Sequence, residues 1–397
     1  MRFLIVNTDY PNFLADMYAK KPGLEEASYD EQMRARYDTL FGMADFYSSN
    51  LRSLGHEAKD IFFNNYFLQR AWLEEHGCPV FGHSLGIAID SIVRKRKKSG
   101  SLYRVMSLVD LANRAIKQNV LYSVLKQQIR DYRPDVLINL APDDISPSFF
   151  TKSRSCIGFL AGQIAAPVPR KYSFNKYDLM LSSLPNFVDN FRKKGIRSEY
   201  LRLGFEPKVL DHFRNGTASG QIPVSFVGSF SGNHSSRTRL FEYIANHQSI
   251  QIWGNDAEKL PPDSRIRQVN HGPVWGKSMY QTLRQSRITL NHHIDISGDF
   301  ANNCRLYEST GTGALLLTDW KKNLDDLFEI DTELVTYKTP EECVEKITYF
   351  LEHEKERQAI AAAGQKRTLN DHTYYLRMQE LIRILEERKR RITAGPE

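Results

Sequence analysis

The sequence lacks several features that would assign a function at once. It holds only four cysteines among 397 residues, and their wide spacing indicates neither a disulfide framework nor a structural zinc site. No run of eighteen apolar residues is present, so no segment is predicted to span a membrane. An Asp-x-Asp segment and a Walker-type Gly-Lys-Ser/Thr loop are also missing. These absences exclude disulfide-rich, integral-membrane and P-loop proteins, and they argue against a bound metal.

The charge balance is basic, with 54 Lys and Arg residues against 47 Asp and Glu residues and a net charge of +7. The densest basic run, RKRKK at residues 94–98, precedes Ser99-Gly100 and reads as a solvated surface loop. Peripheral attraction to the anionic inner face of a membrane is the alternative. Aromatic residues are not interleaved with the basic ones and no nucleic-acid-binding motif accompanies them, so we expect a cytoplasmic protein with no nucleic-acid partner.

Strands and helices alternate along the chain, which predicts an α/β protein with parallel sheets built from βαβ units. A chain of 397 residues exceeds what one hydrophobic core usually supports. We expect an N-terminal Rossmann-like domain at 1–205, a linker at 206–221, a C-terminal Rossmann-like domain at 222–371 and a final helix at 372–391. The linker is placed where Pro207 and a Gly/Thr/Ser-rich stretch interrupt the alternation.

The individual elements follow from short apolar runs and from helical spacing. The expected strands are 1–7, 56–64, 136–141, 156–162, 178–183, 198–204, 222–230, 250–255, 287–293 and 314–319. The expected helices are 28–55, 120–135, 186–195, 235–247 and 277–286, with an almost wholly helical tail from 340 to 390 that breaks near Gly364. Open parallel sheets bind ligands at the carboxyl ends of their strands, so two such sheets predict a cleft between domains.

The segment VSFVGSFSGNHSSR at residues 224–237 is the clearest local signal. An apolar strand ends at Gly228-Ser229, and a helix starts shortly afterwards with Arg237 in its first turn. A glycine lets backbone N–H groups approach a ligand, and a helix N-terminus favours anions. Arg237 would add a charged contact to a diphosphate. The alternative is an ordinary strand-to-helix turn with a serine cap.

A second signal is NNCRLYESTGTGALLLTD at residues 302–319. Asn303 can cap a short helix, and Arg305 and Glu308 are three residues apart and therefore share a helix face. One reading is a surface ion pair, which contributes less than about 1 kcal/mol. The other gives the two residues separate functions, in which Arg305 faces phosphate and Glu308 accepts the hydroxyls of a ribose.

This second segment and a later one resemble the C-terminal half of GT-B glycosyltransferases, nearest to the CgeB-like, group 1-type family. The resemblance covers roughly residues 222–380 and is weaker in the N-terminal half. The residues that carry it are Asn303, Arg305, Tyr307, Glu308, Gly311, Gly313, Thr318, Asp319, His372, Thr373 and Arg377.

The resemblance implies a GT-B fold, with two Rossmann-like domains facing across a cleft and a C-terminal helix that crosses back. It also implies transfer of a sugar from a nucleoside-diphosphate donor to a hydroxyl of a glycan, lipid-linked or protein acceptor. The donor would bind mainly to the C-terminal domain, and neither a metal nor another cofactor would be required. The chain departs from the family at Ala301, where many members have a glutamate that holds the donor sugar; Asp299 is near but out of register.

The reaction would need cations to stabilise the leaving diphosphate, and Arg237, Lys277 and Arg305 are the candidates. His292 and His293 follow a strand and would face the cleft. One of them could contact the donor sugar or phosphate, and a structural, hydrogen-bonded histidine is the alternative. With Gly228, Ser229, Asn303 and Glu308, these residues form the predicted donor site.

An inverting transfer would also need a base on the acceptor side. Asp9, His83 and the Asp143-Asp144 pair are candidates by position, although each could be structural. If Asp143 and Asp144 lie in a strand, their side chains point to opposite faces. Two other functions stay open from the sequence: a non-catalytic nucleotide- or glycan-binding subunit of GT-B type, and a sugar-nucleotide epimerase.

Overall fold

The computed structural model describes residues 1–77, 103–168, 173–213, 220–230 and 235–393. The basic run at 94–98 lies outside these residues. The chain packs into two compact units. The first comprises Met1–Asp38, Gly55–Gln163 and Pro169–Leu179, and the second comprises Thr39–Leu54, Ile164–Val168 and Met180–Glu397. The linker and domain boundaries drawn from the sequence stay predictions.

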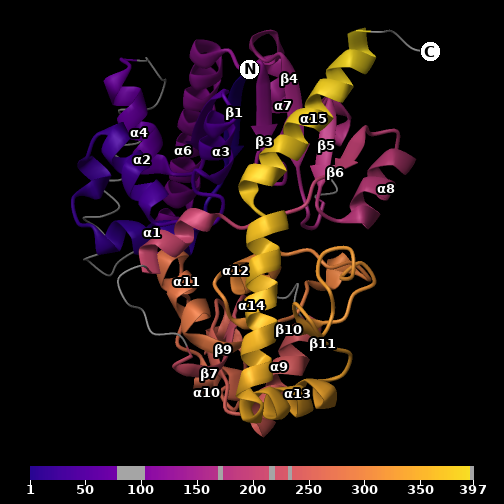
Figure 1. Ribbon diagram of the computed structural model, residues 1–397. Coiled ribbons are helices and arrows are strands. Elements are labelled where there is room, and N and C mark those ends of the chain that lie inside the picture. Colours follow the sequence, from indigo (N-terminus) through magenta and orange to yellow (C-terminus); the bar gives the residue numbers. More distant parts are fainter. Residues whose placement is uncertain (78–102, 169–172, 214–219, 231–234, 394–397) are drawn as a thin grey trace. The chain divides into compact units, whose positions relative to one another are not determined.

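The first sheet has six strands in the order β2-β1-β3-β4-β5-β6, and every pairing whose register is described is parallel. Figure 1 shows this sheet with helices around it. The strands are short and almost wholly buried, as expected for a parallel sheet covered on both faces. They are β1 (Arg2–Asn7), β2 (Glu57–Phe62), β3 (Val136–Asn139), β4 (Phe159–Gln163), β5 (Leu179–Ser182) and β6 (Ser198–Tyr200).

The helices of the N-terminal half are α1 (Pro11–Lys20), α2 (Tyr29–Asp38), α3 (Phe46–Ser53), α4 (Tyr66–Glu75), α6 (Tyr103–Tyr132), α7 (Pro147–Lys152) and α8 (Pro185–Lys193). The single helix expected at 28–55 is therefore wrong, because α2 and α3 are separated by a turn. Leu40, Gly42 and Ala44 have positive φ angles of 55°, 59° and 38° in that turn. The apolar residues that suggested a continuous helix are buried by tertiary packing instead; the ring of Phe41, for example, lies 5.0 Å from that of Trp275.

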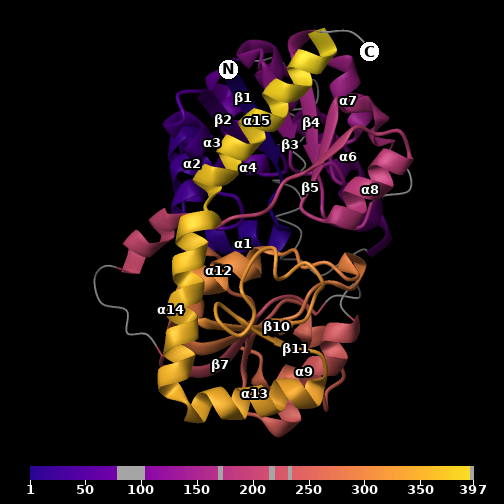
Figure 2. The same cartoon turned by 45° about the vertical axis from the view of Figure 1, so that its right-hand side comes forward.

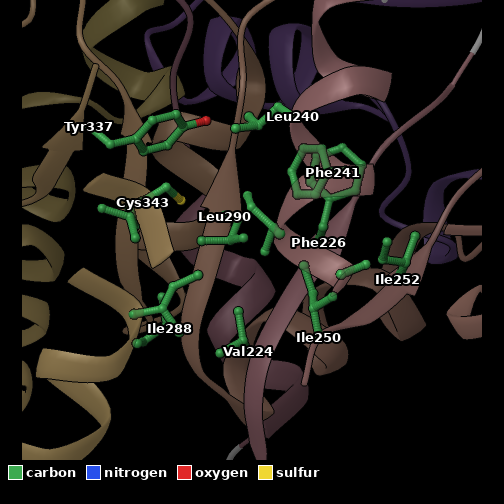
Figure 3. Packing of buried hydrophobic residues seen from close by; sticks show 14 of the residues in the cluster. Val224, Phe226, Leu240, Phe241, Ile250, Ile252, Ile288, Leu290, Tyr337 and Cys343 are labelled. Atoms are coloured by element: carbon green, nitrogen blue, oxygen red, sulfur yellow. The ribbon is translucent and has the colours of Figure 1, made fainter. Parts of the chain in front are cut away.

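The second sheet has five strands in the order β11-β10-β9-β7-β8, all parallel. Its core is aromatic and aliphatic, with the ring of Phe226 lying 4.0 Å from that of Phe241 (Figure 3). The three-residue strand β11 was not expected from the sequence. The strands are β7 (Ile222–Val227), β8 (Gln251–Trp253), β9 (Ser286–Asn291), β10 (Leu315–Asp319) and β11 (Val335–Tyr337).

The helices of the C-terminal half cover this sheet and extend beyond it (Figure 2). They are α9 (Ser235–His247), α10 (Arg265–Val269), α11 (Gly276–Gln285), α12 (Cys304–Gly311), α13 (Pro340–Glu352), α14 (Glu354–Asp371) and α15 (Tyr374–Thr393). Among the described residues, no helix combines the length and the apolar character that crossing a membrane requires.

The expected break of the helical tail at Gly364 is wrong, because α14 runs through this residue. The helices end instead at His353 and His372. A Cβ at position 364 would lie 2.1 Å from the carbonyl oxygen of Glu333. Gly364 therefore allows the helix to approach a neighbouring segment closely, and it does not act as a helix stop.

The final helix α15 packs against α3, a helix from the beginning of the chain that belongs to the same compact unit. The Tyr374 ring lies 5.4 Å from that of Phe46, and its hydroxyl donates to Met43 Sδ at 3.1 Å. Arg377 Nε donates to the carbonyl of Leu203 at 2.9 Å. The C-terminal helix is thus anchored to a segment more than three hundred residues away in the sequence.

Candidate functional site

Polar and charged side chains gather where β7, β9 and β10 end, at the carboxyl edge of the second sheet. Ser229 follows β7, His292 and His293 follow β9, and Asp319 is the last residue of β10. Because β7 and β10 both pair with β9 in parallel, these ends meet at one edge. This is the edge at which α/β folds bind ligands.

Arg237 lies in the first turn of α9 and reaches back to two of these strand ends. Its Nη1 donates to the carbonyl of Ser229 at 2.9 Å, and its Nη2 donates to the carbonyl of His292 at 2.6 Å. The residue is 7% exposed, and burial lowers the pKa of its guanidinium to about 10. In the described part of the chain no carboxylate lies within 4 Å of it, and its Nε has no partner. A buried cation without a paired carboxylate is costly unless an anion arrives to neutralise it.

His293 is held by the carboxylate at the end of the neighbouring strand. Its Nδ1 lies 2.6 Å from Asp319 Oδ1, and its backbone N–H donates to the same oxygen at 3.0 Å. Burial alone would raise the pKa of Asp319, but His293, His292 and Lys321 together hold it well below its ordinary value. His293 Nε2 is buried and has no hydrogen-bond partner among the described residues. The ring is thus fixed through one nitrogen while the other is left over.

His292 has partners on both sides. Its Nε2 lies 3.2 Å from Ser236 Oγ and its Nδ1 lies 3.1 Å from the Tyr337 hydroxyl. Burial lowers the pKa of His292. Of the two adjacent histidines, His292 fits the structural alternative and His293 keeps an unused polar atom.

Helix α12 forms as the sequence predicts. The Asn303 side chain accepts from the backbone N–H of Leu306 at 3.2 Å and caps the helix. Arg305 Nη1 lies 2.9 Å from Glu308 Oε2, with side-chain exposures of 14% and 11%. The expected ion pair is therefore present, but it lies in a largely buried position and not at the exposed surface. Burial raises the pKa of Glu308, whereas Arg305 and a long contact from the Tyr280 hydroxyl at 3.5 Å lower it.

Lys277 lies in the first turn of α11, which packs on α12. Its backbone N–H donates to the carbonyl of Thr39 at 2.9 Å. The preceding Gly276 has φ of +51°, and a Cβ there would lie 2.0 Å from the Thr39 oxygen, so only glycine fits. The Lys277 side chain is half-buried. Its contact to phosphate stays a prediction.

Ala301, at the position where many family members have a glutamate, is buried and hydrogen-bonded through its backbone. Ala301 is 1% exposed, and its backbone N–H donates to Asn323 Oδ1 at 2.6 Å. Asn323 Nδ2 donates back to the Ala301 carbonyl at 3.3 Å. Asp299 is 77% exposed and lies 3.7 Å from Lys322 Nζ, so it does not enter this buried position.

Sequence reasoning missed an amide network that ties the strand ends to α12. Asn291 Nδ2 donates to Thr318 Oγ1 at 2.9 Å, and Asn303 Nδ2 donates to Asn291 Oδ1 at 2.7 Å. The available signal was a polar residue closing each apolar strand, Asn291 in RITLN and Thr318 in LLLTD. This network positions the helix that carries Arg305 and Glu308.

In the first unit, Asp9 follows β1 and lies in a buried ion pair with Arg36 of α2. Arg36 Nη2 lies 2.6 Å from Asp9 Oδ1, and Arg36 Nε donates to Oδ2 at 2.8 Å. Both side chains are almost fully buried, at 1% and 2% exposure. Both carboxylate oxygens are occupied, which gives Asp9 a structural partner. No sequence pattern pointed to Arg36, which lies among the polar residues of α2.

Asp143 and Asp144 lie in a turn after β3 and not in a strand, so the argument about opposite faces does not apply. Thr8 Oγ1 donates to Asp144 Oδ2 at 2.8 Å. Asp143 is exposed, although nearby protein reduces the solvation of its carboxyl and raises its pKa. His83 lies outside the described residues. The assignment of a base to Asp9, His83 or Asp143 therefore stays a prediction.

One segment of the chain matches a known protein family. Residues 236–383 match the family model described as glycosyl transferase-like. This segment contains Arg237, His293, Arg305, Glu308 and Asp319. No curated protein matches the sequence.

Solved glycosyltransferase structures align with nearly the whole chain. A glycosyltransferase from Rickettsia africae has a TM-score of 0.55 at 12% identity, with 98% of each chain covered. HepE from Anabaena, solved with UDP-glucose, has a TM-score of 0.55 at 11% identity, with 98% of this chain and 100% of HepE covered. AviGT4, involved in avilamycin A biosynthesis, has a TM-score of 0.54 at 12% identity, with 100% and 99% covered. The expected fold class, GT-B with two parallel-sheet domains, is confirmed.

Proposed function

We propose that this chain, a GT-B glycosyltransferase of the group 1 type with a glycosyl transferase-like domain at residues 236–383, uses a nucleoside-diphosphate sugar without a metal. It would transfer the sugar to a hydroxyl of a glycan, lipid-linked or protein acceptor. The family model at residues 236–383 and the shared GT-B fold support the resemblance noted in the sequence. The narrower likeness to CgeB-like proteins stays a prediction.

The observation that carries the proposal is the buried guanidinium of Arg237, which pairs directly with no carboxylate in the described part of the chain. Its two terminal nitrogens are held by backbone carbonyls of Ser229 and His292, so its position is fixed before any ligand binds. It lies in the first turn of α9, where the helix dipole also favours negative charge. A diphosphate would supply the missing counter-charge at this place.

The transfer breaks the bond between the sugar C1 and the diphosphate oxygen and forms a bond between C1 and the acceptor oxygen. The acceptor hydroxyl loses its proton, and the leaving diphosphate gains negative charge. Arg237, Arg305 and Lys277 would stabilise that charge electrostatically, which is the function of the metal in metal-dependent transferases. Because fixed cations require little reorganisation during the reaction, they suit a metal-independent mechanism.

Glu308 would bind the ribose of the nucleotide. Its carboxylate is held on one side by Arg305, so its orientation is fixed. An oriented carboxylate can accept hydrogen bonds from two neighbouring hydroxyls, and acidic residues do so in other nucleotide-binding α/β folds. HepE, which shares the fold, was solved with UDP-glucose. UDP is therefore the first nucleotide to test here.

The charge of the chain bears on the kind of acceptor. The net charge of +7 favours an anionic acceptor, such as a lipid-linked diphosphate or an acidic polysaccharide. Peripheral contact with an anionic membrane rests on the basic run at 94–98 and is part of the proposal only to that extent.

The direct test is a thermal-shift screen with UDP, GDP, ADP, CMP and dTDP, each with and without EDTA. A ligand that binds only the folded chain at a hundred times its Kd stabilises it by roughly 2.7 kcal/mol. We expect one diphosphate to raise the Tm, and EDTA to leave that rise unchanged.

Two other results would contradict the proposal. If no nucleotide raises the Tm, the donor site is not where Arg237 and Glu308 lie. If EDTA abolishes the shift, the metal-independent part is wrong and the cations do not suffice. If a nucleotide does bind, slow hydrolysis of the matching nucleotide sugar without acceptor would distinguish a working transferase from a chain that only binds.

A further inference from the structure

A cavity of about 230 Å³ lies in the first unit, away from all the residues discussed above as candidate site residues. Strands β1 and β2 form its floor, and helices α2, α4 and α6 form its walls. It is lined by Arg2, Leu4, Tyr29, Lys59, Asp60, Ile61, Trp72, His76, Gln128, Asp131 and Tyr132.

The cavity lies along the first sheet, from Arg2 at the start of β1 to Ile61 near the end of β2. Arg2 is the first residue of β1, and Asp131 and Tyr132 end the helix that leads into β3. Asp9 and Asp143 follow the carboxyl ends of the same two strands. The lining includes neither Asp9 nor Asp143, and the proposed transfer does not use this cavity.

Gln128 is the feature that points to a ligand. It is 6% exposed, and neither its Oε1 nor its Nε2 has a hydrogen-bond partner in the described part of the chain. The hydroxyl of Tyr132 lies one turn further along α6, and the Arg2 guanidinium lies 4.5 Å from the centre of its ring. An unpaired buried amide is costly, and native proteins rarely leave both of its ends unsatisfied. Together these atoms offer an acceptor and several donors at one wall.

Aromatic rings form the rest of the lining. Trp72 is 7% exposed, and the His76 ring stacks on it at 4.1 Å with an interplanar angle of 13°. Tyr29 packs beside Trp72 in the same cluster. Small-ligand sites typically combine such apolar and aromatic surface with a few convergent polar groups. A volume below the usual 300 Å³ or more of drug-sized sites admits about one six-membered ring.

The charges around the cavity balance. Two cations, Arg2 and Lys59, stand beside two carboxylates, Asp60 and Asp131. A phosphate or a nucleotide would meet as much repulsion as attraction, whereas a neutral ring bearing hydroxyls would not.

We propose that this cavity is an accessory binding site for one neutral pyranose ring of a glycan, recognised by Gln128 and Tyr132 through hydroxyls and by Trp72 and Tyr29 through the ring face. The choice of a sugar as ligand rests on the proposed glycosyltransferase function. A glycan bound here in addition to the acceptor site would be held more tightly than by either site alone, provided that it can reach both.

The test is saturation-transfer NMR with four neutral probes, the methyl glycosides of glucose, galactose, mannose and N-acetylglucosamine. We expect transfer from the wild-type protein to the ring C–H protons of at least one probe. Gln128→Leu removes the polar wall with little change in volume, and we expect the Kd to rise roughly tenfold or more. The matched control is Gln118→Leu, an exposed glutamine on the same helix, which should bind like the wild type.

The readouts separate this inference from the proposed function. UDP should shift the Tm of all three proteins equally, because Gln128 is not in the donor site. If UDP binds but no glycoside receives saturation transfer from the wild type, the accessory site does not exist and Gln128 is satisfied by water. Equal transfer in Gln128→Leu and wild type would also overturn it. Absence of UDP binding would count against the donor site only.

Discussion

The carboxyl edges of the two sheets differ in how their buried arginine is neutralised. In the first unit, Asp9 and Arg36 neutralise each other through two contacts of 2.6 and 2.8 Å, with both side chains buried. In the second unit, Arg237 is 7% exposed, its terminal nitrogens donate to backbone carbonyls and its guanidinium lies 5.6 Å from the centre of the Phe226 ring. His293 keeps an unused nitrogen. The first arrangement is complete without a ligand. In the second, Asp319 and Asp295 act on Arg237 only from beyond 4 Å, and no carboxylate of the described residues pairs with it directly.

This difference shows how to recognise a binding residue among buried charges. A buried ion pair satisfies its own desolvation cost and holds the fold locally. A buried cation held by neutral acceptors makes the free protein less stable than it could be, and such a cost is common at functional sites. Substitutions at the two edges should therefore differ in what they change.

The largest effect is expected from Asp9→Asn, which leaves Arg36 buried and unpaired. We predict a loss of about 3–5 kcal/mol in the free energy of unfolding, measured by denaturant titration. Asp16→Asn, which breaks an exposed pair with Lys20, should cost only about 0.5 kcal/mol. A loss below about 1 kcal/mol in Asp9→Asn would mean that the two edges do not differ as described.

Arg237→Gln should have the opposite profile. We predict that UDP binds about 10- to 100-fold more weakly, because a charge-assisted contact contributes about 1.5–3 kcal/mol. The free protein should lose much less stability than Asp9→Asn does. Isothermal titration calorimetry gives the first quantity and denaturant titration the second.

The control for this variant is Arg239→Gln, which changes an exposed arginine two residues further along α9. This control variant should bind UDP like the wild type. If both variants bind UDP equally well, Arg237 is only a structural residue.

Two buried histidines of the second unit differ in the same way. His293 Nε2 has no hydrogen-bond partner among the described residues, whereas both ring nitrogens of His372 have one. Arg377 Nη2 donates to His372 Nδ1 at 2.7 Å, and His372 Nε2 lies 2.7 Å from the Leu327 carbonyl, so both nitrogens are satisfied in the neutral ring. Burial, together with the nearby Arg377, lowers the pKa of His372 to about 4. The hydrogen bond to the Leu327 carbonyl raises the pKa and offsets only part of this change. Between that value and its ordinary pKa near 6.5, the unfolded chain binds the additional proton.

Stability should therefore fall as the pH falls through this range. From the two pKa values we predict a loss of about 2 kcal/mol between pH 7 and pH 5 from His372 alone. His372→Gln should remove that part of the pH dependence of the unfolding free energy, whereas His247→Gln, at an exposed position, should retain it. An unchanged slope in His372→Gln would contradict the closed arrangement.

The smallest effect is predicted for Glu308→Gln. The substitution keeps the shape but removes the carboxylate that would accept both ribose hydroxyls, so the Kd for UDP should rise about tenfold, or about 1.4 kcal/mol. Exposed Glu258→Gln is the control. If Glu308→Gln lowers the Tm strongly without changing the Kd, the carboxylate serves only to neutralise Arg305.

The sequence was sufficient for the elements that depend on local pattern. Apolar runs located ten strands, and Asn303 and the spacing of Arg305 and Glu308 located α12. The sequence was insufficient where tertiary packing decides. The turn at Leu40–Ala44 is stabilised by distant partners such as Trp275, and Gly364 reflects the approach of Glu333 rather than a helix end.

The same limit applies to the site. Arg237 could be proposed from its place after a glycine-containing turn, but its lack of a carboxylate partner is a property of the folded chain. Arg36, which decides the environment of Asp9, lies 27 residues away in sequence. No local pattern connects the two, because tertiary packing of α2 brings Arg36 to Asp9.

The central claim is that the second sheet's carboxyl edge binds a nucleoside diphosphate through Arg237 without a metal. Calorimetric titration of UDP into the wild type and Arg237→Gln, both in EDTA, tests it most directly. The account predicts saturable binding to the wild type and a Kd at least about tenfold higher for the variant. Identical binding to both proteins, or binding to the wild type only after a divalent cation is added, would contradict it.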